Sequence, residues 1–143
     1  MMFDAFSVTA SGMTAQRLRM NTIASNLANV NTTRTAEGGP YKRKDVVFTS
    51  SPVDFQDVLN SSGDKRFTQG VRISSIIEDP RPFNMVYDPS HPDSDNKGYV
   101  AFPNVNTAEE MVNMISAARS YEANVNAFKA SKSMIMKALD ISS

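Results

Sequence analysis

The sequence has 143 residues, the size of a single domain, and 41% of them are hydrophobic, an ordinary share for a folded chain. Its 15 basic and 15 acidic residues cancel, so bulk charge gives no reason to expect a nucleic acid or an anionic membrane as partner. The lack of cysteine excludes disulfides, zinc–thiolate sites and a cysteine nucleophile. No apolar run reaches transmembrane length, and a start with Asp4 and no basic segment does not match a cleaved secretory signal.

The first predicted element is an amphipathic helix from about Asp4 to Val30. Ala, Met, Gln and Arg favour this helix, whereas Gly12 costs about 1 kcal/mol relative to alanine. Apolar residues recur every three or four positions, which is the pattern of a helix that buries a narrow seam against another helix. They are Phe3, Phe6, Ala10, Met13, Met20, Ala24 and Leu27, with Arg17 as one charged interruption.

The residues after this helix switch to loop and strand signals. Asn31 to Pro40 has the composition of a loop. Tyr41 to Thr49 and Val71 to Ile77 are rich in β-type residues and each predicts a strand. Between them, Phe55 to Leu59 predicts a helical turn or an extended piece, and Asn60 to Asp64 predicts a turn or loop.

A proline-rich connector follows, with five prolines between Pro80 and Pro103. Each proline fixes its own φ and biases the preceding residue toward extended backbone. We therefore expect an extended segment that contains one short strand, Tyr99 to Phe102.

The most pronounced element is a helix from Thr107 to Ile141, about 50 Å long at 1.5 Å per residue. Thr107 can cap it while Glu110 reaches back in a capping box, and Glu109 lies where the helix dipole favours negative charge. Its seam consists of Met111, Met114, Ala118, Tyr121, Val125 and Phe128, then, after the interruption of Lys132, Ile135 and Leu139.

These elements predict a mainly α-helical fold, in which two long terminal helices pair as a coiled-coil-like hairpin and carry a small, irregular β-containing insert. The expected segments are an N-terminal helix (1–31), a middle insert (32–106) and a C-terminal helix (107–143), with the two termini forming one helical domain. The residues leave two interpretations open. The seams either pair within one chain, or they also, or only, pack against other copies or other proteins.

Signals for chemistry are poor. His91 is the only histidine, and nothing in the sequence places a nucleophile near it. Asp93, Asp95 and Gly98 match three positions of a calcium-binding loop. Lys97, however, stands where an oxygen ligand is needed and Asn104 where a bidentate glutamate is needed, so the segment is interpreted as a polar turn. No catalytic residue, cofactor or metal ion is expected.

Two groups of polar residues have competing interpretations. The basic cluster Tyr41 to Lys44 is better explained as a solvated strand edge than as a nucleic-acid contact, and charge pairing with a neighbouring subunit stays open. Asparagine is frequent at the end of the first helix and along the last one, which favours hydrogen bonds that fix the register of packed helices. These residues are Asn21, Asn26, Asn29 and Asn31, and then Asn113, Asn124 and Asn126.

Several long motifs resemble the bacterial flagellar rod and hook axial proteins, and within that family the proximal rod proteins. The motifs are Ser25 to Thr32, Thr33 to Lys44, Tyr87 to Pro92, Gly98 to Asn106, Glu109 to Ile115 and Arg119 to Phe128. The resemblance covers both ends and much of the middle, and the stretch from about Ser50 to Gln69 matches least.

This resemblance implies a structural subunit of the basal-body rod, which spans the periplasm and transmits motor torque to the hook. The implied partners are other rod subunits, basal-body and export-gate adaptor proteins, and the flagellar type III export apparatus, which exports such proteins without cleaving a signal. It implies no nucleic acid and no direct membrane insertion. The rival hypothesis is a soluble helical adaptor or chaperone-like binding module.

The residues expected to pair the helices and to contact neighbouring subunits come from both helices. They are Phe6, Met13, Met20, Asn26, Leu27, Asn29, Asn31, Met111, Met114, Ala118, Tyr121, Asn124, Val125 and Phe128. Because a lone chain would expose apolar stripes, we also expect the terminal helices to become ordered only on incorporation.

Overall fold

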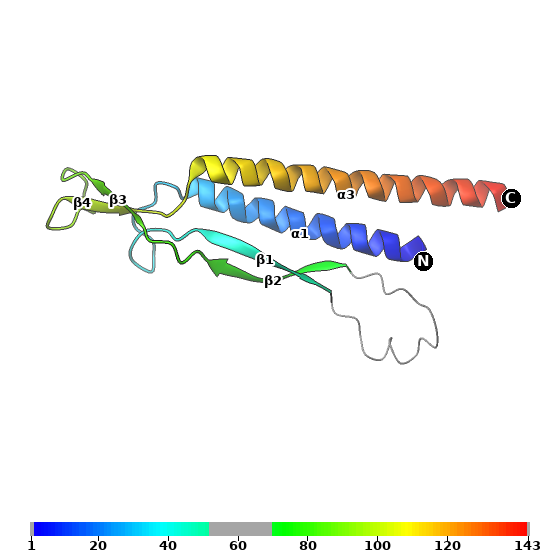
Figure 1. The fold of residues 1–143 in the computed structure, drawn as a ribbon, viewed down its shortest axis with the longest axis horizontal. Helices are drawn as coiled ribbons and strands as arrows, with labels where there is room; N and C mark the ends of the chain where they lie inside the picture. Colours follow the sequence, from blue (N-terminus) through cyan, green and yellow to red (C-terminus); the bar gives the residue numbers. More distant parts are fainter. Residues whose placement is uncertain (1, 52–69, 143) are drawn as a thin grey trace, which may run out of the picture. The chain divides into compact units, whose positions relative to one another are not determined.

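The structure is a computed structural model that describes residues 2–51 and 70–142 (Figure 1). The expected elements at 55–59 and 60–64 lie outside the described residues. The elements in order are α1 (Met2–Ala28), β1 (Lys44–Ser50), β2 (Val71–Glu78), β3 (Asn84–Tyr87), β4 (Tyr99–Phe102) and α3 (Thr107–Ser142). The prediction of two long helices around a small β-containing insert is confirmed.

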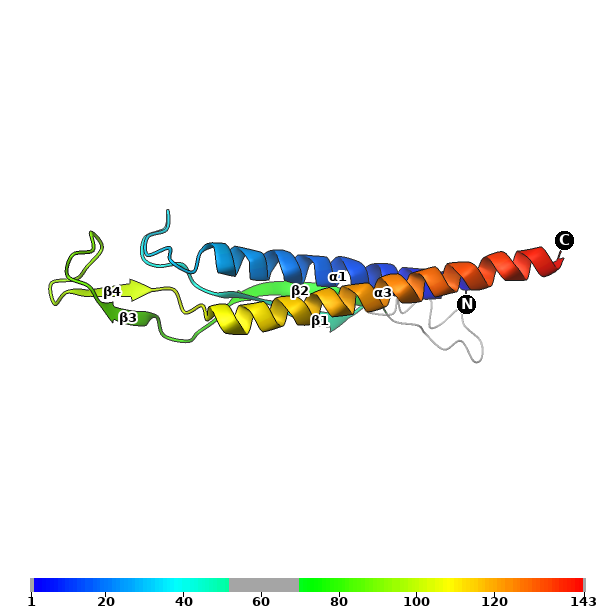
Figure 2. The same ribbon diagram turned by 90° about the horizontal axis from the view of Figure 1, so that it is seen from above.

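The strands form two separate two-stranded sheets, β1 with β2 and β3 with β4 (Figures 1 and 2). In the second sheet the strands are antiparallel, with Asn84 opposite Phe102 and Tyr87 opposite Tyr99. The proline-rich connector thus holds two strands, and the prediction of a single one was wrong. The missed strand β3 is only four residues long, so its strand character depends on pairing with β4.

The contacts between Cα atoms divide the chain into two compact units. Unit 1 comprises the described parts of Met1–Leu18, Val47–Ser75 and Ala117–Ser143, and unit 2 comprises Arg19–Val46 and Ile76–Ser116. Each unit contains a part of both helices and a part of the insert. The expectation that the termini by themselves form one domain stays a prediction.

In unit 1 the two helices run antiparallel and touch at an aromatic contact and at a glycine. The rings of Phe6 and Phe128 meet edge to face, with centroids 4.8 Å apart. Further along α1, a Cβ atom on Gly12 would lie 3.0 Å from the side-chain amide of Asn124. The helix backbones approach closely there because Gly12 has no side chain.

The start of β2 lies on α1 in the same unit. The hydroxyl of Ser11 accepts a hydrogen bond from the backbone N–H of Val71 (3.1 Å) and donates to the carbonyl of Val8 (2.7 Å). A Cβ atom on Gly70 would come within 2.7 Å of the Ser11 hydroxyl oxygen. Small residues on both sides therefore let a strand lie directly against the helix.

The observed face of α3 follows a regular three-four spacing that differs from the predicted seam at its start. Glu110 and Ala117 are buried, and the half-buried residues are Asn113, Met114, Ala118, Ser120, Tyr121, Asn124, Val125, Phe128, Ser131 and Ile135. Met111, placed in the seam by its apolar character, is 56% exposed, and Glu110 takes the inward position instead.

The buried face of α1 is likewise built of small and polar residues. Its most buried positions are Gly12, Ala15, Thr22, Ile23 and Asn26, whereas Ala10 and Ala24 of the predicted seam are exposed. The helix must face both α3 and the strands, so its buried stripe is shifted from the one that the apolar spacing predicted.

Enlarging Gly12 should force the helices apart. We expect Gly12→Leu to lower the free energy of unfolding by about 1–3 kcal/mol, because the new side chain overlaps Asn124. Thr14→Leu, at an exposed position two residues away, is the matched control and should leave stability nearly unchanged. Thermal unfolding followed by circular dichroism measures both, and Asn124→Ala should partly restore the Gly12→Leu variant.

Candidate functional site

The central residue of unit 2 is Glu110, a fully buried carboxylate in the first turn of α3. Its Oε1 accepts a hydrogen bond from Arg43 Nε at 2.7 Å, and its Oε2 accepts one from Asn26 Nδ2 at 3.0 Å. A buried charge is costly unless it is paired and hydrogen-bonded. These two bonds therefore join the first helix, the residue before β1 and the last helix at one point.

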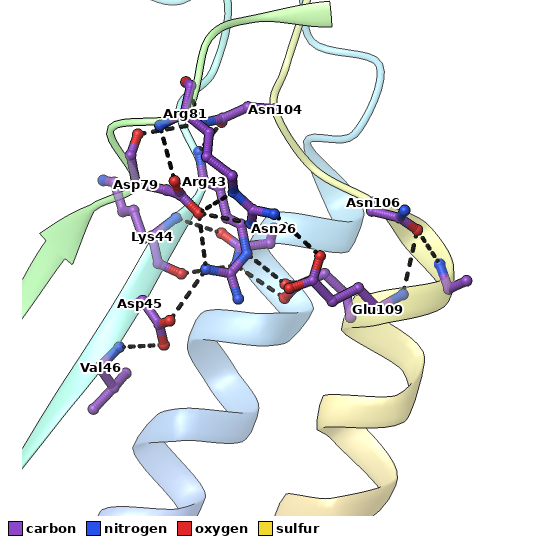
Figure 3. Close-up of polar contacts among 12 residues, drawn as sticks. Asn26, Arg43, Lys44, Asp45, Val46, Asp79, Arg81, Asn104, Asn106 and Glu109 are labelled. Atoms are coloured by element: carbon purple, nitrogen blue, oxygen red, sulfur yellow. Dashed lines mark hydrogen bonds and ion pairs between the residues drawn. The ribbon is translucent and has the colours of Figure 1, made fainter.

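Arg43 is buried as well and contacts three carboxylates. Besides Glu110, its Nη1 lies 3.3 Å from Asp79 Oδ2 and 3.1 Å from Asp45 Oδ2, as Figure 3 shows for these two aspartates. Burial lowers the pKa of Arg43, but the hydrogen bonds to Glu110 and Asp45 outweigh it and raise the pKa above the ordinary value. The guanidinium is thus held in its charged form.

Asn26 ties the end of α1 to the start of β1. Its Nδ2 donates to the carbonyl of Lys44 (2.8 Å) as well as to Glu110, and its Oδ1 accepts from the Lys44 N–H (3.0 Å) and the Tyr41 hydroxyl (3.0 Å). The side chain is completely buried and both ends of its amide are satisfied. The side-chain amide of Asn26 therefore makes the same pair of hydrogen bonds to the Lys44 backbone that a neighbouring strand residue would make.

A second layer of contacts covers Arg43. The carboxylate of Asp79 accepts from Arg81 Nε at 2.8 Å, and Arg81 Nη1 lies 3.3 Å from Glu109 Oε2 (Figure 3). The side chain of Asn104 accepts from the Arg43 N–H at 2.8 Å and donates to the backbone carbonyls of Asp79 and Arg81. The segment after β2 is fastened to the start of α3 in this way.

The N-cap of α3 is Asn106, so the predicted capping box of Thr107 and Glu110 was wrong. The Asn106 Oδ1 accepts hydrogen bonds from the N–H groups of Ala108 (3.0 Å) and Glu109 (3.3 Å). Glu110 does not reach back to the cap, because Arg43 offers its carboxylate a charged partner inside the fold.

A pocket of about 320 Å³ lies beside this cluster and is lined mainly by polar and charged side chains. Arg19 and Thr22 of α1, Lys44 and Asp45 of β1, and Asn113 of α3 are among its lining residues. Within residues 2–51 and 70–142, no group of three or more His, Cys, Asp or Glu side chains is placed to hold a metal ion. No helix among these residues is long and apolar enough to cross a membrane.

The structure gives each remaining predicted pairing residue a position. Most are half-buried, namely Phe6, Met13, Met20, Leu27, Asn29, Met114, Ala118, Tyr121, Asn124, Val125 and Phe128. Asn31 is exposed, as is Met111. The role of these residues in contacts between subunits stays a prediction.

The asparagines play unequal roles. Asn26 bridges to the last helix, as predicted for register-fixing amides. Asn29 instead donates to the carbonyl of Ser25 in its own helix, and Asn124 donates to that of Ser120. These local bonds satisfy the amide donors within one helix and do not set register.

The basic cluster is not a solvated strand edge as a whole. Arg43 is 6% exposed and its partners lie in the same chain, which corrects that prediction. Lys42 and Lys44 are exposed, and Lys42 Nζ lies 3.1 Å from Glu78 Oε2. The four residues alternate along an extended segment, so Tyr41 and Arg43 point inward together.

The segment from Asp93 to Gly98 is a polar turn, as predicted. The Asp95 carboxylate accepts from the N–H groups of Lys97 (2.8 Å) and Tyr99 (2.9 Å), and Gly98 adopts a positive φ of 80°. His91 belongs to the same turn region, where its Nδ1 accepts from the Asp93 N–H at 3.1 Å.

Both terminal segments of the chain match known protein families. Residues 6–34 match the model described as flagella basal body rod protein, and residues 96–141 match the model described as flagellar basal body rod FlgEFG protein C-terminal. The two matches cover most of α1 and α3, and both models describe proteins of the flagellar basal-body rod.

Relatives that align with nearly the whole chain show which rod protein family it belongs to. The chain is 49% identical to the flagellar basal-body rod protein FlgC of Bacillus subtilis, with 97% of each chain covered. It is 47% identical to FlgC of Borreliella burgdorferi (98% of this chain, 97% of the relative) and 40% identical to FlgC of Escherichia coli O157:H7, with the same coverage. The chain therefore belongs to the FlgC family of flagellar basal-body rod proteins.

Removing one partner of the buried ion pair should be far more damaging than removing both. We expect Arg43→Met and Glu110→Met each to lower the free energy of unfolding by about 3–5 kcal/mol, because each strands a buried charge. The double variant should lose less than the sum of the two losses. Urea unfolding measures this, and Lys42→Met, which breaks an exposed pair, should cost about 1 kcal/mol or less.

Equal and additive losses at Arg43 and Glu110 would show that the two charges do not stabilise each other.

Acid should weaken the contacts of Asp79. The hydrogen bond from Arg81 lowers the pKa of Asp79 below its ordinary value of 3.8, so its contribution is present above that pH and is lost as the pH falls through the lower, folded-state pKa. Asp79→Asn should therefore destabilise the protein at neutral pH and converge on the wild type only once the pH lies below the folded-state pKa of Asp79. Unfolding curves at a series of pH values measure this, and a difference that stays constant with pH would contradict it.

Proposed function

We propose that this chain, a structural subunit of the flagellar basal-body rod, polymerises through its paired terminal helices and transmits motor torque to the hook. The rod role follows from membership of the FlgC family. The observation that supports polymerisation is the apolar surface that α3 leaves exposed. The contact between the two antiparallel helices is narrow and buries only a small part of that surface. Met111, Val112, Ile115, Met134, Met136 and Leu139 are all more than half exposed.

The proposed partners are other rod and basal-body proteins. The relatives are named as flagellar basal-body rod proteins, which supports assembly of this chain with similar subunits. We further propose that it lies in the proximal rod, spanning the periplasm, that the flagellar type III apparatus exports it without cleaving a signal, and that an export-gate adaptor protein contacts it. The resemblance of its motifs to proximal rod proteins supports this placement.

Torque transmission needs segments that keep their register under load. The cluster of Asn26, Arg43 and Glu110 supports this role because it crosses between α1, the start of β1 and α3. A slip of either helix would strand a buried charge, which is costly. The torque would then be borne jointly by many weak contacts between helices and by the few buried polar contacts of this cluster.

The helix-pairing residues divide by their burial into two proposed roles. Half-buried ones such as Phe6, Tyr121 and Phe128 are proposed to pair the helices, and exposed ones such as Asn31 and Met111 to contact neighbouring subunits. In this proposal the helices that assemble the rod lie in residues 1–31 and 107–143, and residues 32–106 form the insert between them.

We propose a structural and not a catalytic role, because the relatives are named as flagellar basal-body rod proteins. The alternative of a soluble adaptor module is not favoured, since nearly the whole chain aligns with FlgC proteins.

Electron cryotomography of the source bacterium with this gene deleted tests the proposal. We expect inner rings and export apparatus to remain while no rod extends from them, because a missing rod subunit interrupts the shaft. The intact gene supplied in trans is the control and should restore both rods and swimming. Complete rods in the deletion strain would overturn the proposed role.

A further inference from the structure

The strand β3 has an open edge. Among the described residues it pairs with β4 alone, so no strand lies on its other side (Figure 1). An isolated pair of strands is marginally stable, and an open edge offers unpaired N–H and C=O groups to another chain. All four residues of β3 are exposed. The edge is therefore accessible to a strand of a partner.

The register of the sheet shows which backbone groups face this edge. Directly beyond the last pair of the sheet, the N–H of Asp88 donates to the carbonyl of Gly98 at 2.9 Å. Hydrogen-bonded and non-hydrogen-bonded pairs alternate in an antiparallel sheet, so Met85 and Tyr87 belong to non-hydrogen-bonded pairs. The N–H and C=O groups of these two residues therefore point away from β4.

The side chains along the edge are apolar and form an open face. Met85 and Tyr87 are 54% and 64% exposed. The ring of Tyr87 meets that of Tyr99, which is also exposed, edge to face with centroids 5.3 Å apart. We call these three residues the hairpin face. Edge strands that resist pairing often carry lysine, and β3 carries no charged residue.

The opposite face of the sheet is packed, which holds the edge in place. Val100 is completely buried, and the ring of Phe102 meets that of His91 with centroids 6.2 Å apart. The turn between the strands is fastened as well, because the carboxylate of Asp93 accepts from the hydroxyl of Thr33 at 2.8 Å. A surface that already has its binding conformation loses less entropy when a partner binds.

A negative charge lies at the end of the edge. Asp88 follows Tyr87 directly, and its Oδ1 accepts from the N–H (3.1 Å) and the hydroxyl (2.6 Å) of Ser90. These hydrogen bonds lower the pKa of Asp88, so the carboxylate is ionised at neutral pH. Among the described residues, no basic side chain forms an ion pair with it.

The other charges of the turn balance one another. Asp93 lies 3.9 Å from the guanidinium of Arg34, and Asp95 is attracted to the nearby charge of Lys97. The charge of Asp88 is the one that these basic groups leave unbalanced, so a basic group of a partner fits beside it.

We propose that the open edge of β3 takes a short extended segment of another protein, in which apolar residues alternate with arginine or lysine. The backbone of that segment bonds to Met85 and Tyr87, and its apolar side chains lie against the hairpin face. Successive side chains of a strand point to opposite faces, so its basic side chains share the face of Asp88. Such cross-strand pairs are favourable. This inference goes beyond the proposed assembly of helices, because it assigns a contact to the insert.

Hydrogen exchange of the purified full-length chain, followed by NMR, tests the inference. The probe is a blocked peptide of about six residues in which valine alternates with arginine. Without peptide we expect fast exchange at the amides of Met85 and Tyr87 and slow exchange at Asp88, which is bonded to Gly98. Peptide at about ten times its dissociation constant should slow the Met85 and Tyr87 amides by about tenfold.

Two changes of the probe separate the contributions to binding. Methylation of the peptide nitrogens that face β3 removes the backbone donors and should abolish the protection. Replacement of arginine by glutamate should weaken binding by about two- to fivefold, because it places a like charge beside Asp88.

Variants of the chain locate the contact. Met85→Lys should weaken peptide binding severalfold, since a lysine on an edge strand opposes pairing. Ile76→Lys, at an exposed apolar position of β2, is the matched control and should leave binding unchanged. Asp88→Asn keeps an oxygen for Ser90 and should weaken the arginine peptide, but not a peptide with threonine in place of arginine.

Each contrary result removes a defined part of the inference. Fast exchange at Asp88, protection at other amides only, or equal effects of Met85→Lys and Ile76→Lys would overturn the edge contact. Protection that appears without peptide and grows with protein concentration would assign the edge to a second copy and overturn the proposed occupant. Binding unaffected by Asp88→Asn would overturn its basic character. The rod role stands in every case, because it follows from family membership.

Discussion

The buried ion pair of Arg43 and Glu110 is the constraint on which the organisation of unit 2 depends. Glu110 opens the last helix, Arg43 precedes the first strand, and Asn26 brings the end of the first helix to the same point. Neither charge tolerates burial without the other. The requirement to keep them together fixes where the first helix ends, where the strand begins and which face of the last helix turns inward.

The contact between the two long helices is built from small residues. Gly12, Ala15 and Ala117 keep the buried face small, so the helices approach closely while most large apolar side chains of α3 stay outside. Side chains of this type are most often found in the core of a soluble domain. Because a polar cluster and the packing of small residues stabilise this fold, its exposed apolar surface is available for contacts with neighbouring proteins.

Sequence reasoning predicted the helices well, because a three-four spacing sustained over many turns is a strong local signal. Both ends of α1 and α3 were placed within about two residues. The strand β3 was missed, since a four-residue segment between prolines has little local preference and depends on its partner β4.

The candidate site was harder to predict than the fold. Asn26 was singled out as a register-fixing amide, and its bridge to the last helix agrees with that. The role of Glu110 was missed, because its local sequence fits a capping box and its true partner, Arg43, lies 67 positions away. Met111 shows the same limit: apolar character suggested burial, but the register that a buried carboxylate imposes turned it outward.

The pairing of Asn26 with Lys44 also closes a neck at the base of the loop that joins α1 to β1. A second closure lies further out, where the Tyr41 N–H donates to the Thr32 carbonyl at 3.0 Å. At the tip, Gly38 and Gly39 have positive φ angles, and no atom lies within 4 Å of where a Cβ would stand on either. Because lengthening a loop beyond a fixed neck adds little closure entropy, the size of this tip is independent of the register below it. Evolution, or an engineer who needs a permissive place for a tag, can lengthen the loop there without disturbing the joint that orders the helices.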